Sequence, residues 1–401
     1  MRSSASGLEF SASDLSRHSA CRRLTALDVS VAKGLRGAPS YHNPAVDILA
    51  QRGLEHERRY VDALVTQGLA VAELSAVASG APTDTALAAT LNALRSGVDV
   101  VVQPTLRHER WFGRPDVLRR VDTLASTLGG WSYEVVDTKL AEETRGATIL
   151  QLAVYSDLLA RVQGVLPERF YVVTPDPVAP MQTYRVQDYA AYFRLLRARL
   201  EAATREDPMA LLGSTYPAPV HYCDVCRWWS ECDKKRHDDD HFSLVAGISR
   251  LQMRELRGRG ITTLAQVGTL PDPLPFFPKR GSRDTYERVR EQARVQLLGR
   301  TRGEPVYELL QPLGVAHGLA RLPAPSPGDI FLDLEGDPFA REGGREYLFG
   351  VAVLGADGAC SYQRYWAHSD AEESAAFDAV VRAILDAWAT NPAMHAYHYA
   401  P

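Results

Sequence analysis

The chain has 401 residues, of which 45% are hydrophobic and 23% are charged, and its formal net charge is −4. This is ordinary globular composition, and the length is enough for two or three domains. No stretch of the sequence approaches the roughly 20 apolar residues that a transmembrane helix needs, so we do not expect a membrane-spanning protein. The N-terminus also lacks the apolar core of a signal peptide, so we expect a cytoplasmic protein with no membrane partner.

The hydrophobic pattern changes its period several times along the first 240 residues, which predicts an α/β domain. Apolar residues that recur every three to four positions indicate helices, and short apolar runs that end in polar turns indicate strands. The helices are expected over residues 43–67, 83–96, 147–162 and 188–204, and the strands over residues 98–106, 110–121, 131–140, 169–174 and 181–186.

A charged run over residues 234–242 predicts the end of this first domain, which we assign to residues 1–240. The next segment, residues 241–322, is expected to be a connector with two short helical pieces and an Arg-rich helix near residues 283–298. A Pro- and Gly-rich run then predicts a linker into a third domain, residues 323–401.

The two short helical pieces of the connector resemble a helix–hairpin–helix. Gly258 and Gly260 permit a tight turn between them, and Thr262 or Thr263 could cap the second helix. Such a hairpin can present backbone N–H groups to DNA phosphates. A plain helical linker is an equally good interpretation of the same pattern.

The third domain begins with the apolar strand IFLDLEGDPF at residues 330–339, which carries Asp333 and Glu335 near its end. Further strands are expected over residues 347–354 and 395–401. Two carboxylates at the end of a strand are, by themselves, only a weak indication of a metal site.

The strongest chemical pattern lies in consecutive strands of the first domain. Asp116 follows the bend-forming Gly113 and Pro115, while Asp137 and Lys139 end the apolar run YEVVDTKL. Side chains two positions apart in a strand share a face, so Asp137 and Lys139 should project together, and Asp116 joins them if the strands pair. Carboxylates, a backbone carbonyl and water suit Mg²⁺ or Mn²⁺, and the ammonium could help activate a water. For D-x-K alone, a surface ion pair is the commoner explanation.

Two helices could contribute to the same site. His56 lies beside Gly53 on the otherwise buried face of the helix over residues 43–67, and imidazole suits Mn²⁺ better than Mg²⁺. Gln151 and Tyr155 are four positions apart, so they share a face of the helix that follows the D-x-K strand and could steady a phosphate or a water. Taken singly, each of these residues is more often explained by packing.

Five cysteines are few for a disulfide scaffold, and three of them follow the crowded pattern C-x2-C-x5-C. These are Cys223, Cys226 and Cys232, whose spacing indicates a metal or cluster site before a disulfide. From spacing alone, zinc and an iron–sulfur cluster are equally good interpretations. Cys360 lies outside the set and is expected to be an ordinary buried thiol.

The motifs, taken in order, resemble the RecB-like branch of the PD-(D/E)XK nuclease superfamily. The resemblance covers residues 8 to about 240. Glu134 faces the other way on the Asp137 strand, so we expect it to be non-catalytic. The matching motifs are Gly53-Leu-Glu-His56, Gly113-Arg-Pro-Asp116, Asp137-Thr-Lys139 and Gln151-Leu-Ala-Val-Tyr155.

This resemblance implies a restriction-endonuclease-like fold and a nuclease active site that uses Mg²⁺ or Mn²⁺. The implied site residues are the metal ligands His56, Asp116 and Asp137, the catalytic lysine Lys139, and the supporting side chains Gln151 and Tyr155.

The cysteines extend the resemblance to the iron–sulfur subset of this family, which includes AddB-type nucleases and CRISPR-adaptation exonucleases. In that subset, one cysteine before the core and three after it bind a 4Fe–4S cluster. Here the implied ligands are Cys21, Cys223, Cys226 and Cys232. The cluster would close a loop of about 200 residues, so its loss should cost much of the stability of the domain.

The third domain resembles the N-terminal part of a DEDD-type exonuclease with an RNase H-like fold, in which Asp333 and Glu335 would be the first metal-binding pair. The other acidic ligands of that family have no counterpart here, so we expect an incomplete and catalytically silent domain that longer proteins complete. The whole order resembles a bacterial family of RecB-like nucleases in which a superfamily 1 helicase usually follows. This sequence has no G-x-x-x-x-G-K-[ST] phosphate loop, so a helicase would be a partner domain or subunit.

Together these features predict a metal-dependent DNA exonuclease that acts on single-stranded ends in repair, recombination or defence. The first alternative is a non-catalytic nucleic-acid-binding accessory module of a helicase–nuclease. The second alternative is a DEDD-type exonuclease that uses Asp333 and Glu335 as its metal ligands.

Overall fold

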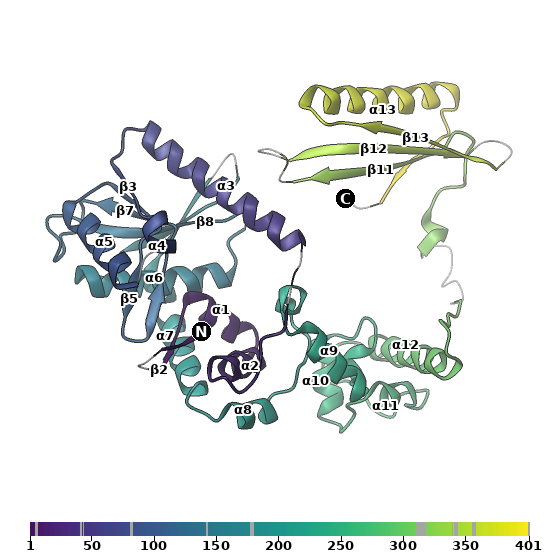
Figure 1. The fold of residues 1–401 in the computed structure, drawn as a ribbon. Coiled ribbons are helices and arrows are strands. Elements are labelled where there is room, and N and C mark those ends of the chain that lie inside the picture. The colour runs from purple at the N-terminus through teal and green to yellow at the C-terminus, as the bar shows by residue number, and fades with distance from the viewer. Residues whose placement is uncertain are drawn as a thin grey trace. The chain divides into compact units, whose positions relative to one another are not determined.

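The structure is a computed structural model and describes residues 1–4, 7–40, 42, 44–80, 83–141, 143–176, 180–309, 318–338, 340, 344–354 and 358–399. It is a mixed α/β protein with several separate sheets. The chain divides into two compact units (Figure 1), the first made of Met1–Thr174 with Met181–Glu308 and the second of Pro175–Pro180 with Leu309–Pro401. The domain boundaries expected near residues 240 and 322 remain predictions.

The first unit is built on a six-stranded sheet of β3 (Val71–Glu73), β4 (Val100–Val102), β7 (Val117–Val121), β8 (Ser132–Thr138), β9 (Arg169–Val173) and β10 (Met181–Arg185). Its strand order is β10-β9-β8-β7-β4-β3. The β4–β7, β7–β8 and β9–β10 pairs are antiparallel, whereas the β3–β4 and β8–β9 pairs are parallel.

Helices cover both faces of this sheet (Figure 1). The helices of this part of the chain are α1 (Ala12–Ala20), α2 (Arg22–Ala32), α3 (Pro44–Thr66), α4 (Ser75–Gly80), α5 (Thr83–Ser96), α6 (Gly146–Gln163) and α7 (Val186–Ala203). The four predicted helices are confirmed to within two residues at each end, whereas α1, α2 and the short α4 were not predicted.

Strand β8 is buried along its whole length. Successive side chains of a strand point to opposite faces, so both faces of β8 are covered by a core. Tyr133 and Val135 lie in the core that contains α6, whereas Val136 lies in the core that contains Leu64 of α3. Asp137 alternates in step with Val135, and this places its carboxylate on the α6 side of the sheet.

Two of the predicted strands are each divided, which corrects the continuous strands expected over 98–106 and 110–121. The first consists of β4 and β5 (Leu106–His108), because Gln103 has a φ of 51° and turns the chain between them. The second consists of β6 (Trp111–Gly113) and β7, because Pro115 has no N–H with which to continue a ladder. Strands β5 and β6 pair as a separate antiparallel hairpin, so Asp116 lies just before β7.

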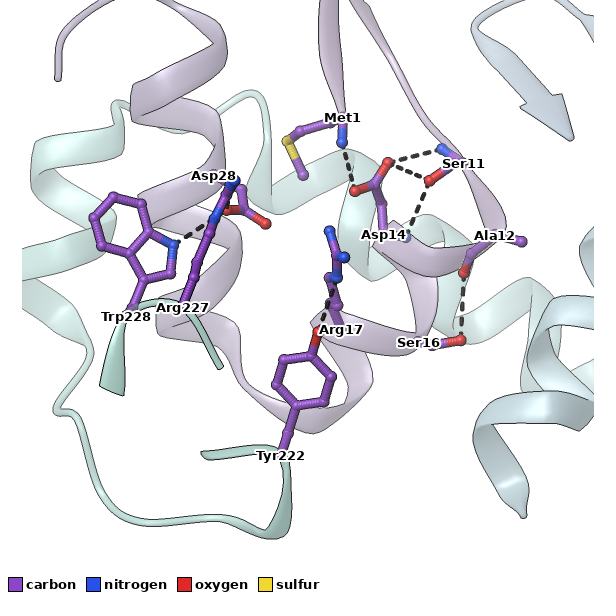
Figure 2. Close-up of polar contacts among 10 residues, drawn as sticks. All are labelled: Met1, Ser11, Ala12, Asp14, Ser16, Arg17, Asp28, Tyr222, Arg227 and Trp228. Carbon is purple, nitrogen blue, oxygen red and sulfur yellow. Dashed lines mark hydrogen bonds and ion pairs between the residues drawn. The ribbon is translucent and has the colours of Figure 1, made fainter. Parts of the chain in front are cut away.

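Residues from the two ends of the predicted first domain lie side by side (Figure 2). The later end contains α8 (Pro208–Ser214), the 3-10 turn η1 (His221–Val225) and α9 (Trp229–Asp238). Arg17 of α1 donates from Nε to the Tyr222 hydroxyl at 3.0 Å. Asp28 of α2 accepts hydrogen bonds from Arg227 Nη2 at 2.6 Å and from Trp228 Nε1 at 3.3 Å. These contacts hold together segments that are about 200 residues apart in sequence.

The connector is a helical segment with its own small core around Phe242 and Leu264. It contains the 3-10 turn η2 (Phe242–Leu244), α10 (Arg250–Arg257), α11 (Leu264–Gly268) and α12 (Arg283–Arg302). Thr263, not Thr262, caps α11 by accepting a hydrogen bond from Gln266 N. Gly260 has the left-handed φ of 78° that the turn requires, whereas Gly258 keeps a helical conformation.

The second unit contains a four-stranded sheet in the order β13-β12-β11-β14, with one long helix. Only the β11–β14 pair is parallel among these strands. Cys360 is exposed at the start of an edge strand, which corrects the expected buried thiol. The elements are η3 (Gly318–Arg321), β11 (Ile330–Asp337), β12 (Arg345–Leu354), β13 (Cys360–Trp366), α13 (Asp370–Thr390) and β14 (Ala396–His398).

Helix α13 packs on one face of the β11–β14 sheet, where Ile330 and Val351 meet Val380. The described part of strand β14 confirms the strand expected after residue 395, and the last two residues of that expected strand lie outside the described residues. Within the described part of the chain, no helix is both long and apolar enough to cross a membrane.

Candidate functional site

Asp116 is fixed at the end of the central sheet by hydrogen bonds to the neighbouring strand. Its Oδ2 accepts one hydrogen bond from Thr138 N at 2.8 Å and another from Thr138 Oγ1 at 3.0 Å. Val117 pairs with Val136 in the antiparallel register, so Asp116 lies across from Asp137. The strand pairing that brings Asp116 beside Asp137 is therefore present.

Asp137 is a fully buried carboxylate, with a side chain that is 0% exposed. Its Oδ2 forms an ion pair with Lys139 Nζ, whereas its Oδ1 accepts no hydrogen bond from any described residue. Burial and the nearby Asp116 carboxylate together raise the pKa of Asp137 above its ordinary value. The side chain is thus an acceptor that the described residues satisfy only in part.

Lys139 reaches the same point from the end of β8, and its side chain is 31% exposed. Burial lowers its pKa, but the carboxylates of Asp137 and Asp116 outweigh burial and raise the pKa overall. Asp137 and Lys139 therefore project together, as their spacing of two residues predicts. The Lys139 ammonium is partly exposed beside the buried Asp137 carboxylate, so a substrate could contact the ammonium from solvent.

Tyr155 and Gln151 approach this pair from helix α6. Gln151 Nε2 donates to the Tyr155 hydroxyl at 3.1 Å. Burial, followed by the charge of Asp137, raises the pKa of Tyr155, so the phenol stays protonated and can donate. The ring lies so close to Gly113 that a Cβ there would come within 2.6 Å of Tyr155 Cε1. Gly113 is therefore the residue that lets α6 approach the sheet at this point.

Glu57 and Gln103 also border the site, and neither residue belongs to a motif of the sequence. Gln103 Nε2 donates to Glu57 Oε1 at 2.5 Å, and Gln103 N donates to the backbone oxygen of Asp116 at 2.8 Å. Burial and the Asp116 carboxylate raise the pKa of Glu57. The only sequence signal was the position of Glu57 next to His56, and the positive φ of Gln103 gives no pattern in a strand.

His56 is buried on α3, but its contact differs from the one expected of a metal ligand. Its Nε2 lies 3.2 Å from the backbone oxygen of Val173. Because a carbonyl only accepts, Nε2 must carry the proton, and Nδ1 is left as the acceptor nitrogen. The structure thus places His56 at the end of β9, and no described contact joins it to Asp116 or Asp137.

A cavity of about 640 Å³ opens beside Glu57 and Gln103. Arg58 and Arg114 line it, both side chains are exposed, and neither has an ion-pair partner among the described residues. Arg114 lies two positions before Asp116, so the cavity approaches the carboxylate pair. Glu57, Asp62 and Glu73 also line this cavity, so its charge is mixed, and the two unpaired guanidinium groups are the part of it that can bind an anionic ligand.

The four cysteines of the predicted cluster site, Cys21, Cys223, Cys226 and Cys232, line one small cavity against Trp228. All four are free thiols. Burial raises the pKa of Cys226, and it raises the pKa of Cys232 to about 11. Four sulfur donors have the chemistry that suits iron or zinc, but among the described residues no three of them are arranged so that they could hold a metal ion.

Asp333 and Glu335 are exposed on β11, and Leu332, which precedes Asp333, faces the core of the second unit. The two carboxylates share the opposite side of the strand. The structure therefore leaves this pair without the surrounding acidic ligands that a two-metal site needs among the described residues.

The donor chemistry of Asp116 and Asp137 fits a divalent cation. Among the residues that the structure describes, no group of three or more His, Cys, Asp or Glu side chains is arranged so that it could hold a metal ion. Mg²⁺ needs fewer protein ligands, because one or two carboxylates commonly hold it together with water and substrate phosphates. The unsatisfied Oδ1 of Asp137 and the neighbouring Asp116 carboxylate match that requirement.

No protein-family model matches this chain, and no curated protein matches it either. The interpretation of the site therefore depends on its residues and their geometry.

The two motif glycines should respond in opposite ways to the same substitution. Gly113→Ala should lower the free energy of unfolding by about 1–3 kcal/mol, because the new Cβ overlaps the Tyr155 ring. Gly53→Ala has open space around its Cβ in helix α3, so it should raise that free energy by about 0.4–1 kcal/mol. Urea unfolding of both variants measures the difference, and a Gly113→Ala protein as stable as Gly53→Ala would contradict the packing described for Tyr155.

Proposed function

We propose that this chain is a metal-dependent deoxyribonuclease whose active site contains Asp116, Asp137 and Lys139. The observation that carries the proposal is the buried Asp137 carboxylate. One of its oxygens has no hydrogen-bond partner among the described residues, and the Asp116 carboxylate adds a second negative charge beside it. Such an arrangement costs folding free energy, and groups of this kind are concentrated at functional sites. A bound cation would offset the charge of both carboxylates.

Each residue of the site has a distinct role in this proposal. Mg²⁺ or Mn²⁺, held by Asp116 and Asp137, would supply a Lewis acid and lower the pKa of a bound water. Lys139 is placed to offset charge on a scissile phosphate and to orient the attacking water, because its ammonium is partly exposed beside Asp137. Gln151 and the protonated Tyr155 hydroxyl would steady the phosphate or that water.

His56 and Glu57 are further candidates for this site on helix α3. His56 could join the ligands through Nδ1, whereas Nε2 keeps its contact with the backbone oxygen of Val173. Glu57 is held by Gln103 and lies near Asp116, so it could accept a hydrogen bond from the attacking water and orient it. The assignment of His56 as a ligand, which the family resemblance implies, stays a prediction.

The cavity beside the site supports a polynucleotide substrate. Arg58 and Arg114 could contact the phosphates of a strand that enters toward Asp116. We propose single-stranded DNA ends as the substrate, as in the family that the motifs resemble. The rival interpretation, a non-catalytic nucleic-acid-binding module, would use the same cavity without hydrolysis.

The order α3-β4-β7-β8-α6-β9 supports a restriction-endonuclease-like core of the RecB-like type, with the carboxylates at the ends of adjacent strands. We propose that Cys21, Cys223, Cys226 and Cys232 hold a 4Fe–4S cluster, since they share one cavity. The second unit would correspond to the start of an RNase H-like domain, and a helicase would be a separate domain or subunit.

Purified protein with Mg²⁺ or Mn²⁺ should degrade single-stranded DNA. Asp137→Ala and Lys139→Ala should each reduce the rate by about a hundredfold or more, because each removes a group used in the transition state. The measurement is the initial rate of release of acid-soluble nucleotides, with circular dichroism to verify that each variant is folded.

The matched control for this experiment is the double variant Asp333→Ala with Glu335→Ala, which removes two exposed carboxylates from the second unit. We expect it to retain the wild-type rate. If the double variant is inactive while a folded Asp137→Ala protein is fully active, the active site lies in the second unit and the proposal is wrong.

The cysteine cavity should contain an iron–sulfur cluster in protein purified without oxygen. Cys21→Ala should lose iron and acid-labile sulfide and should unfold at a lower temperature, because the cluster joins distant segments. Cys360→Ala is the control, since Cys360 is exposed on another sheet and should leave the metal content unchanged. Stoichiometric zinc without sulfide in the wild-type protein would show that the site is a zinc site.

A further inference from the structure

A basic surface lies in the connector, on elements other than those that carry the carboxylate pair. It surrounds a cavity of about 460 Å³ formed by α10, the turn that follows it, and the loop before α12. Four cationic side chains line this cavity against one carboxylate, Glu255. The four cations are Arg254, Arg259, Lys279 and Arg280.

Only one of these cations is neutralised by the cavity's own carboxylate. Arg259 forms an ion pair with Glu255 at 2.8 Å, and this hydrogen bond is the main reason that the pKa of Glu255 is lowered. Glu255 also accepts a hydrogen bond from Lys279 N at 2.9 Å, which fixes the loop. For Arg254, Lys279 and Arg280, the described residues provide no side-chain ion-pair partner.

The loop also carries Phe277, which is 78% exposed. The loop is held in place, because Arg259 Nη2 donates to the backbone oxygen of Phe277 at 3.2 Å and the Tyr286 hydroxyl donates to the backbone oxygen of Arg280 at 3.2 Å. The Arg283 guanidinium lies 4.9 Å from the centroid of the Phe277 ring. The neighbouring Phe276 packs against the connector core, so Phe277 is not needed to fill that core.

We propose that this surface, formed by Arg254, Phe277, Lys279 and Arg280, binds single-stranded DNA. An exposed aromatic ring on a fixed loop offers a stacking platform for an unpaired base, and flanking cations contact the backbone phosphates. A duplex keeps its bases stacked, so the ring favours single strands. The proposal rests on the proposed function only for the choice of DNA over RNA, because the same phosphate and base chemistry is present in both.

The test is fluorescence anisotropy of the full chain with fluorescein-labelled oligo(dT) of twenty nucleotides in EDTA, so that no metal-dependent cleavage occurs. Lys279→Glu with Arg280→Glu should raise Kd by about tenfold or more and flatten the dependence of Kd on salt. Phe277→Ala should raise Kd by roughly fivefold to a hundredfold and should leave binding of a duplex of equal length unchanged.

Two exposed residues of the same unit provide matched controls. Arg302→Glu reverses a charge at the opposite end of α12, about 28 Å from Arg283 along the helix axis. Tyr307→Ala removes an aromatic ring that is 82% exposed. Both variants should bind oligo(dT) as the wild-type protein does.

The outcomes separate this proposal from the proposed nuclease activity. Hydrolysis of bis(p-nitrophenyl) phosphate, which is a phosphodiester without a nucleobase or a second phosphate, should be unchanged in the connector variants and lost in Asp137→Ala. Unchanged oligo(dT) affinity in folded Lys279→Glu with Arg280→Glu and Phe277→Ala proteins would overturn the binding surface, whatever the nuclease assay shows. If these variants lose only oligo(rU) binding, the surface is an RNA site and the choice of DNA is wrong.

Discussion

The carboxylate of Asp137 is buried at the end of strand β8, and none of the groups around it offsets its charge in full. Lys139 provides one ion pair, but Asp116 brings a second negative charge to the same place. Burying an ion without complete pairing lowers the free energy of unfolding by roughly several kcal/mol, so packing elsewhere in the unit has to offset that loss. The buried strand β8, with a core on each face, is the element that does so.

The packing around this pair explains why its geometry is specific. Thr138 holds Asp116 through two hydrogen bonds, and the absence of a side chain at Gly113 lets Tyr155 approach from α6. On the other side, Gln103 turns the chain and holds Glu57. The same unit is tied together at a distance by Asp28, Arg227 and Trp228, which hold the segment with the later cysteines against α2.

Much of this arrangement follows from the local pattern of the sequence. The spacing of Asp137 and Lys139 predicted a shared face, and the four-residue spacing of Gln151 and Tyr155 predicted their contact, because both depend only on the period of one element. The first divided strand was missed because a positive φ at Gln103 gives no hydrophobic pattern, and the second was missed because the bend expected at Pro115 was placed inside one continuous strand. Glu57 was missed because its partners come from two other segments. The exposed Cys360 shows that burial depends on the position of a strand within its sheet.

The central claim is that the Asp137 carboxylate is completed by a cation. The most direct measurement is the unfolding temperature of the wild-type protein and of Asp137→Asn, each in Mg²⁺ and in EDTA. We expect Mg²⁺ to raise the unfolding temperature of the wild-type protein alone. At a Mg²⁺ concentration of a hundred times Kd, the gain in the free energy of unfolding is about 2.7 kcal/mol. In EDTA, Asp137→Asn should be at least as stable as the wild type, because it removes a buried charge. An equal Mg²⁺ effect on both proteins, or none on the wild type, would contradict the account.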